Sequence, residues 1–311
     1  GTILCLYEDS NRELWLGSYF DGLARMNKQT GTCQDATSLL QGNLNAGKPK
    51  VSCIIEDKNK NLWVGTYGSG LYKINLPTQH VTYYESTRNE NDDWSINRLP
   101  NDWISYLLED KEGMIWIGTY KGLAVLNPQT DNFINYKKQN NLLPGYVVYS
   151  LLESSNGEIW AGTSEGLVCL NKDRLTPVLF TTADGLPSDI ICGLAEDEKK
   201  NIWISTHQGI SKLNPPEKKF INYYAGDGLQ GNEFTRTAVF KDKRGKIFFG
   251  GTNGVTAFYP QDITEIKKEM NVLITGFHVA NRPVKKGDKS GNNVITDTAV
   301  MDTEQFTLAY N

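Results

Sequence analysis

Residues 61–71 read NLWVGTYGSGL, and the chain of 311 residues contains six versions of this stretch. Each version has an apolar run around one aromatic residue, then a short polar turn, then a glycine followed by an apolar residue. The aromatic residues recur at intervals of 43 to 53 positions: Trp15, Trp63, Trp116, Trp160, Trp203 and Phe248. A period of this length, with strand-type sequence in every unit, is typical of a β-propeller.

The second repeat shows how one unit divides into strands. Apolar or β-branched runs at 51–56, 62–66, 71–75 and 80–84 alternate with polar turns that contain Asp, Asn, Gly or Pro. Such runs predict an antiparallel meander. We therefore predict an all-β fold in which residues 1–261 form a propeller of four-stranded antiparallel blades, with six repeats visible.

A second, smaller domain is expected after the repeats. Residues 262–271 are polar and charged and are interpreted as a connector. Apolar runs at 272–279 and 306–310 predict strands, with a turn at 281–283 and an exposed loop at 285–293. We interpret 272–311 as the opening of a β domain that is incomplete in this chain, and we expect the chain to be a piece of a longer protein.

Charge and composition argue against several classes of protein. The 32 basic and 36 acidic residues give a net charge of −4 without a block of like charge, which does not suit a nucleic-acid or polybasic membrane surface. No run of about 18 apolar residues and no signal-peptide pattern is present. The three histidines and five cysteines lack metal-ligand spacing, so no metal or cofactor is predicted, and Cys5 and Cys53 are interpreted as buried strand fillers.

Acidic residues also recur at fixed offsets. A Glu stands seven positions before most of the central aromatic residues and an Asp six positions before, as in Glu56 and Asp57. An enzyme needs its catalytic acid once, whereas a blade needs its turn in every copy. We therefore interpret the Asp as a turn cap that accepts hydrogen bonds from local backbone N–H groups.

The motifs resemble a known family. The pattern ED…(L/I)W(L/I/V)GT…GL…N, the entry loops of the GLPSD type at 185–189 and the closing DGLQGNEF at 227–234 look like two-component-regulator propeller repeats. Those repeats build the periplasmic sensor half of hybrid two-component systems of gut Bacteroidetes. The segment from Val272 resembles the start of the immunoglobulin-like domain, named for three tyrosines, that follows the propeller there.

The resemblance implies more than the residues show. It implies a seven-bladed propeller, of which six repeats are seen, followed by a β-sandwich, a transmembrane helix and a histidine kinase outside this chain. It implies a periplasmic, non-enzymatic region without a cofactor that senses glycan-derived oligosaccharides and belongs to a homodimer. Signalling would control polysaccharide-utilisation genes. This region would contact no nucleic acid and would meet the membrane only through a downstream helix.

A ligand would bind where the copies diverge. In propeller topology the loops between second and third strands share a face with the loops that enter each first strand. Sugars need aromatic faces and polar groups together, and Lys121 or Arg236 would suit a carboxylate or sulfate. Trp103, which aligns with Ile190, is interpreted as core. The candidate ligand residues are Tyr19, Tyr67, Tyr120, Lys121, His207, Asn253, Arg236, Trp94 and Asp102.

Two other functions stay open. The first is a propeller that mediates protein interaction or dimerisation and has no small ligand of its own. The second is an enzyme such as a propeller lyase or hydrolase, against which the sequence offers no nucleophile elbow, no metal spacing and no carboxylate pair unique to one blade.

Overall fold

A computed structural model describes residues 2–40, 47–86, 98–136, 143, 147–171, 176–264, 274–303 and 305–309. The contacts divide the chain into two units, Gly1–Asp262 and Ile263–Asn311. Each unit is taken by itself.

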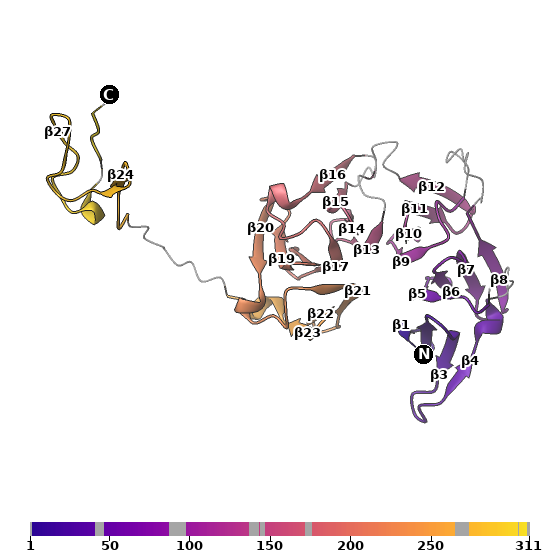
Figure 1. The fold of residues 1–311 in the computed structure, drawn as a ribbon. Coiled ribbons are helices and arrows are strands. Elements are labelled where there is room, and N and C mark those ends of the chain that lie inside the picture. The colour runs from indigo at the N-terminus through magenta and orange to yellow at the C-terminus, as the bar shows by residue number, and fades with distance from the viewer. Residues whose placement is uncertain are drawn as a thin grey trace. The chain divides into compact units, whose positions relative to one another are not determined.

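The first unit is a β-propeller of six blades, which follow one another from β1 to β23 (Figure 1). Neighbouring strands within each blade are antiparallel, in chain order. Blade 1 contains β1 (Ile3–Glu8), β2 (Leu14–Ser18), β3 (Gly22–Met26) and β4 (Cys33–Asp35). Blade 2 contains β5 (Val51–Glu56), β6 (Asn61–Thr66), β7 (Leu71–Asn75) and β8 (His80–Tyr84). Blade 3 contains β9 (Ile104–Glu109), β10 (Ile115–Thr119), β11 (Gly122–Asn127) and β12 (Asn132–Tyr136). Blade 4 contains β13 (Val148–Glu153), β14 (Ile159–Thr163), β15 (Leu167–Leu170) and β16 (Pro177–Phe180). Blade 5 contains β17 (Ile191–Glu196), β18 (Ile202–Thr206), β19 (Gly209–Asn214) and β20 (Lys219–Tyr223), and blade 6 contains β21 (Phe234–Lys241), β22 (Ile247–Gly251) and β23 (Gly254–Phe258).

The predicted propeller is confirmed, and the prediction of four strands per repeat is wrong for the sixth blade. In the described part of the chain, blade 6 has only three strands. After β23 the chain enters the short 3-10 turn Pro260–Asp262 instead of folding back. A proline has no N–H to donate to a strand ladder, so it favours an ending at this point.

The central tryptophan of each of the first five blades packs against the blade that follows. Trp63, which is fully buried, shares a core cluster with Ile104 and Ile117 of blade 3. Trp63 also stacks on Tyr84 of its own fourth strand, with 6.0 Å between the ring centroids. The same stack joins Trp116 to Tyr136, Trp160 to Phe180 and Trp203 to Tyr223. These large apolar faces fill the space between successive sheets.

The repeated Asp caps a turn, as predicted, and also binds the tryptophan. Asp57 Oδ1 accepts hydrogen bonds from the backbone N–H groups of Asn59 and Asn61, both at 2.9 Å, while Oδ2 accepts the indole N–H of Trp63 at 2.8 Å. The same three bonds occur at Asp9, Asp110 and Asp197. One carboxylate therefore fixes both the hairpin and the rotamer of the buried aromatic ring.

The repeated Glu joins neighbouring blades. The Glu109 carboxylate of blade 3 accepts the backbone N–H of Lys58, in the turn of blade 2, at 3.1 Å. The spacing of the Glu residues in the sequence gives no sign of this role. Equivalent bonds run from Ser10 to Glu56, from Lys111 to Glu153 and from Ser155 to Glu196.

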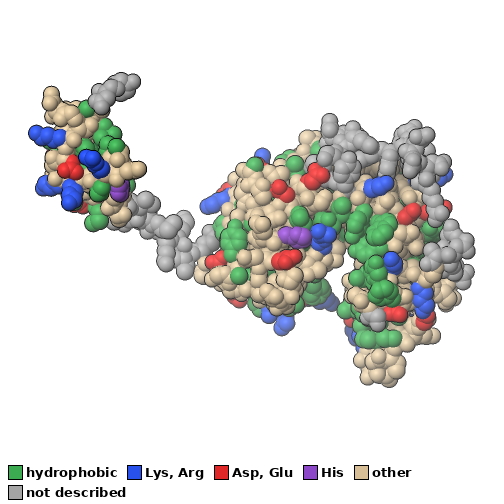
Figure 2. Space-filling model, viewed as in Figure 1, with side chains coloured by type: hydrophobic (Ala, Val, Ile, Leu, Met, Phe, Trp, Pro, Cys, Tyr) green, Lys and Arg blue, Asp and Glu red, His purple; other side chains and the backbone are tan. Residues whose placement is uncertain are grey.

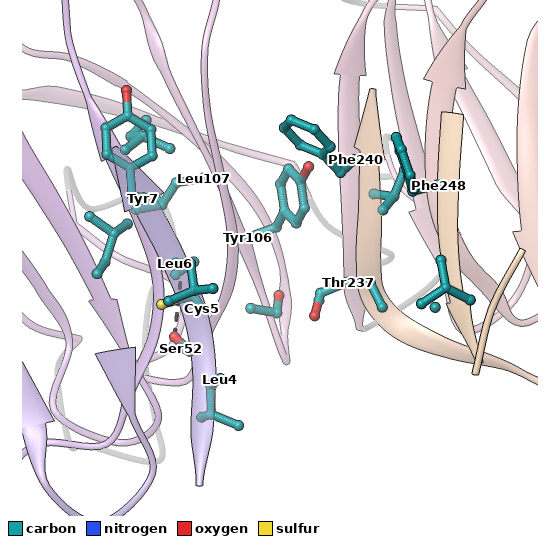
Figure 3. A pocket seen from close by; sticks show the side chains of 18 residues that line it. Leu4, Cys5, Leu6, Tyr7, Ser52, Tyr106, Leu107, Thr237, Phe240 and Phe248 are labelled. Atoms are coloured by element: carbon teal, nitrogen blue, oxygen red, sulfur yellow. Dashed lines mark hydrogen bonds between the residues drawn. The ribbon is translucent and has the colours of Figure 1, made fainter. Parts of the chain in front are cut away.

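The outer faces of the first and last blades are open. Ile3 and Leu6 on β1 are 49% and 61% exposed, whereas the residues at the same two positions of blade 2, Val51 and Ile54, are 0% and 6% exposed. On blade 6, Phe240 is 64% exposed. Figure 3 shows β1 and β21 on opposite sides of a cavity of about 640 Å³. The faces that meet inside every pair of successive blades are therefore uncovered here.

The second unit is small. Two short hairpins pair β24 (His278–Val279) with β25 (Arg282–Pro283) and β26 (Lys289–Ser290) with β27 (Asn293–Val294). Among the described residues of this unit the predicted strands are shorter than expected or absent: strand structure begins at His278, and residues 305–309 form none. Residues 272, 273 and 310 of the predicted strands lie outside the described residues. Phe277 stacks on Phe306 at 4.3 Å. A sandwich strand needs a second sheet to cover its apolar face, and no such sheet lies among the described residues.

Candidate ligand site at the mouth of the propeller

Six repeated backbone bonds define one face of the propeller. The residue four positions after each central aromatic donates its N–H to the carbonyl of the residue that precedes the innermost strand. Tyr67 bonds to Lys50 at 2.8 Å, and Tyr120 bonds to Trp103 at 3.1 Å. The other donors are Tyr19, Ser164, His207 and Thr252, and their acceptors are Thr2, Val147, Ile190 and Glu233. The predicted common face of the two kinds of loop is thus confirmed, and each blade brings two variable side chains to it.

Three aromatic side chains gather where blades 2 and 3 meet. Tyr67 stacks on Trp103 with 5.7 Å between centroids and an interplanar angle of 29°. Tyr120 packs against both rings, at 5.7 Å from Tyr67 and 5.5 Å from Trp103. Burial raises the pKa of Tyr67, and Tyr120 raises it further, so its phenol is neutral at physiological pH. We call these three residues the aromatic group.

The interpretation of Trp103 as core is wrong, because its side chain is 42% exposed. The residue directly precedes β9 instead of lying within it, and its ring packs on Tyr67 and Tyr120 at the mouth. The sequence held a usable signal. Trp103 and Lys50 both stand thirteen positions before a central Trp, and that position varies from blade to blade.

Tyr19 and Lys50 form a separate pair between blades 1 and 2. The ammonium of Lys50 lies 4.6 Å from the centroid of the Tyr19 ring and donates to its hydroxyl at 3.2 Å. Phe20, which is exposed, packs edge-on against Tyr19 at 4.8 Å. The ammonium of Lys50 and the hydroxyl of Tyr19 therefore bind each other.

A charged group lies on the far side of the mouth. The guanidinium carbon of Arg236 stands 4.6 Å from the centroid of the Tyr149 ring. Burial lowers the pKa of His207, Arg236 lowers it further and Glu233 raises it. The N–H of Gly209 donates to the carbonyl of Asn232 at 2.6 Å, so the turn that contains His207 lies beside the loop that precedes β21. Burial raises the pKa of Tyr149, Arg236 lowers it and Tyr120 raises it. On the face in view in Figure 2, a histidine lies next to basic and acidic side chains.

The remaining predicted residues differ in what they can offer. Lys121 and Asn253 are exposed. Both carboxylate oxygens of Asp102 accept bonds from Ser86, at 2.6 and 2.9 Å. The corresponding loops use Asp189 and Asn232 in the same way, through the N–H groups of Thr182 and Ala225. The fold accounts for Asp102, so we leave it out of the proposed contacts. Trp94 lies outside the described residues.

Within the described residues, no group of three or more His, Cys, Asp or Glu side chains could hold a metal ion. No helix in that part of the chain is long and apolar enough to cross a membrane.

The repeats themselves match a known family model. The model described as two component regulator propeller matches residues 47–68, 98–121, 142–165 and 185–208. Four of the six repeats, those of blades 2 to 5, are two-component-regulator propeller repeats. Each matched stretch runs from an entry loop to the turn that follows the central Trp, so these repeats include the variable positions of the mouth. A search of curated proteins found no sequence match.

Several solved structures share the fold of this chain. The extracellular domain of a putative hybrid two component system from B. thetaiotaomicron superimposes with a TM-score of 0.72 at 24% identity, over 92% of this chain and 39% of that chain. PorZ, a surface component of the type-IX secretion system of Porphyromonas gingivalis, gives 0.63 at 16% identity, over 83% and 38%. Virginiamycin B lyase from Staphylococcus aureus gives 0.60 at 10% identity, over 84% and 85%. These likenesses establish the fold, and the chain spans well under half of the first two proteins.

Proposed function

We propose that this chain is the ligand-sensing region of a hybrid two-component system. It would lie in the periplasm, bind a glycan-derived oligosaccharide and signal across the membrane to a histidine kinase that controls polysaccharide-utilisation genes. The regulator propeller repeats support this proposal, as does the shared fold with an extracellular domain of such a system. We assign the chain a binding role and no catalysis, and turnover of an oligosaccharide by the purified protein would contradict that assignment.

The aromatic group is the observation that carries the ligand proposal. An indole ring that is 42% exposed yet held by stacking on Tyr67 presents a flat and rigid face. A sugar ring can pack its C–H groups on such a face while its hydroxyls meet polar side chains. The proposed contacts are Tyr67, Trp103 and Tyr120, with Lys121, His207, Arg236 and Asn253 as polar partners and Tyr19 at the edge.

Calorimetric titration with a panel of glycan oligosaccharides tests the ligand proposal. Saturable binding to one class is expected, and Trp103→Ala should weaken it about tenfold or more, because stacking on an exposed aromatic contributes on the order of 1–3 kcal/mol. Ile134→Ala is the matched control, since Ile134 is exposed on the outer strand β12. If a ligand binds and Trp103→Ala has no more effect than Ile134→Ala, the assigned contacts are wrong.

We also propose that a seventh blade covers the open faces. Leu6 and Phe240 lie on surfaces that every internal pair of blades buries, and such apolar faces are costly to leave in water. The Glu8 carboxylate also supports a seventh blade. Its counterparts, such as Glu109, accept a backbone hydrogen bond from the turn of the preceding blade. Glu8 is exposed and instead pairs with Lys28 at 2.9 Å. The chain with one more native repeat before Gly1 should unfold at a higher temperature than the chain alone. An unchanged midpoint would contradict a seventh blade.

The alternative function is a propeller that binds another protein or a second copy of itself. The exposed apolar faces of blades 1 and 6 favour it, because surfaces of that kind are typical of interaction sites. Sedimentation separates the two functions: a stable dimer combined with silence across the oligosaccharide panel would support interaction. The immunoglobulin-like sandwich and the homodimer of the longer protein remain proposals alongside it.

A further inference from the structure

The innermost strand of blade 6 departs from the other blades. In β21, residues 235–238 lie between the ladder partners Phe234 and Val239, while only Gly250 lies between their partners on β22. The equivalent irregularity in β5 adds a single residue, Ser52. Thr237 has a φ of 65°, a conformation that β-branched residues rarely adopt. A bulge re-aims side chains, and local strain of this kind is concentrated at functional sites.

This bulge carries Arg236 from blade 6 to blade 4. β21 and β13 contact each other although blade 5 separates them in the sequence. Arg236 lies over the ring of Tyr149, which occupies the bulge position of β13. In blades 2, 3 and 5 that position holds a small donor, Ser52, Ser105 or Cys192, which bonds to a carbonyl of the next blade. Tyr149 gives up this bond and supplies a platform for the guanidinium instead.

The guanidinium of Arg236 is held in place and still free to bind. Its face rests on Tyr149, a cation–π contact that orients the group. Arg236 is exposed and forms no ion pair or hydrogen bond with another side chain in the described part of the chain. The planar fork of N–H donors matches the two oxygens of a carboxylate or sulfate. The neighbouring acid is Glu233, which lies three residues before Arg236 in the chain.

We propose, building on the proposed function, that the ligand is an acidic saccharide whose carboxylate or sulfate is bound by Arg236. The anionic group lies against the guanidinium edge beside His207, and a sugar ring packs on the exposed face of Trp103. Tyr149 carries the guanidinium on its ring at one end, and Tyr120 packs against Trp103 at the other. The mouth would thus recognise the anionic group of the ligand at Arg236 and a sugar ring at Trp103.

Matched oligosaccharide pools test the proposal by calorimetry. Pectin oligosaccharides are compared with the same pool after reduction of the carboxylates to alcohols, and carrageenan oligosaccharides with the same pool after desulfation. We expect binding only to the anionic member of one pair, which tells carboxylate from sulfate. Arg236→Gln should weaken that binding about 10- to 100-fold, as expected for a charge-assisted contact. Arg236→Lys should restore part of it.

Arg244→Gln is the matched control, because Arg244 is an exposed arginine of the same blade in the turn between β21 and β22, which the propeller places on the opposite face. If the neutral member of a pair bound as tightly as the anionic member, and Trp103→Ala still weakened that binding, the ligand would not need an acidic group. That result would overturn the inference and leave the proposed function standing. Absence of binding by all four pools would overturn this inference, whereas absence of binding across the whole oligosaccharide panel would count against the sensor function itself. An Arg236→Gln effect no larger than that of Arg244→Gln would also overturn the inference.

Discussion

Blade 4 lacks the Asp that binds the tryptophan in four other blades, and restoring it should stabilise the protein. Ser154 stands at the Asp position, and its hydroxyl accepts the N–H of Glu158 at 3.2 Å. The indole N–H of Trp160 is buried and has no hydrogen-bond partner among the described residues. A serine is one atom too short to reach both groups. We therefore predict that Ser154→Asp raises the free energy of unfolding.

The magnitude follows from the bonds seen at Asp57. An aspartate would satisfy the indole N–H, and leaving such a buried donor unpaired costs about 1–3 kcal/mol. Charge-assisted bonds to the turn amides add to this gain. Against it, the new carboxylate would stand beside Glu158, whose Oε2 lies 3.5 Å from the Ser154 hydroxyl, and such a pair of like charges costs about 1 kcal/mol at about 4 Å where the dielectric is close to that of water. The expected net gain is about 1–2 kcal/mol, or about 2–4 °C in Tm for each kcal/mol.

Thermal and denaturant unfolding of purified variants measures this gain. Ser154→Ala is the control for loss of the serine, and Asp57→Ser is the mirror variant that gives blade 2 the arrangement of blade 4. Asp57→Ser should cost about 2–3 kcal/mol, because it leaves Trp63 and two backbone amides with fewer bonds. A Ser154→Asp variant no more stable than Ser154→Ala would refute the reasoning, since the carboxylate would then have failed to reach the indole.

Three further predictions follow from the contacts. Arg236→Gln should raise the pKa of His207 towards its ordinary value, because burial and then Arg236 lower it; an NMR titration of the imidazole that shows no change would place Arg236 too far away. Glu109→Ala should destabilise the chain by about 1 kcal/mol, whereas Glu8→Ala should have almost no effect on the unfolding midpoint because it removes only an exposed ion pair. Gly70→Ala should cost more than about 2 kcal/mol in denaturant unfolding, since φ is 67° and a Cβ there would lie 2.3 Å from a backbone carbonyl; a loss below 1 kcal/mol would contradict it.

The periodic part of the structure could be predicted from the sequence because each blade buries the same face. The second-repeat strands at 51–56, 71–75 and 80–84 coincide with β5, β7 and β8. Trp63 and its capping Asp57 recur at fixed spacing, so a structural role explains them without any structure. The hydrogen bonds between blades could not be predicted in the same way. A Glu that caps its own turn and a Glu that caps the turn of the preceding blade have the same spacing in the sequence.

The candidate site was only partly predictable because it is built from positions where the repeats differ. Tyr67 and Tyr120 were found from their common offset. Trp103 was misplaced, since a tryptophan just before a strand and one within it differ by one step in register and lie in different environments. The partner of Arg236 could not be found, because Tyr149 is two blades away and only a non-repeating bulge brings the two together.

The departures from the repeat meet in one place, and this is the strongest structural reason to regard the mouth as functional. Blade 4 replaces a small bulge donor with Tyr149 and leaves the Ser150 hydroxyl without a partner among the described residues. Blade 6 lengthens its bulge and holds Thr237 in a strained conformation. Either change alone weakens its own blade. Together the two changes bring Arg236 onto the ring of Tyr149. The two blades thus lose stability while the mouth gains one positioned cation. A repeat fold that breaks its own rules twice to make one contact is better explained by binding than by packing.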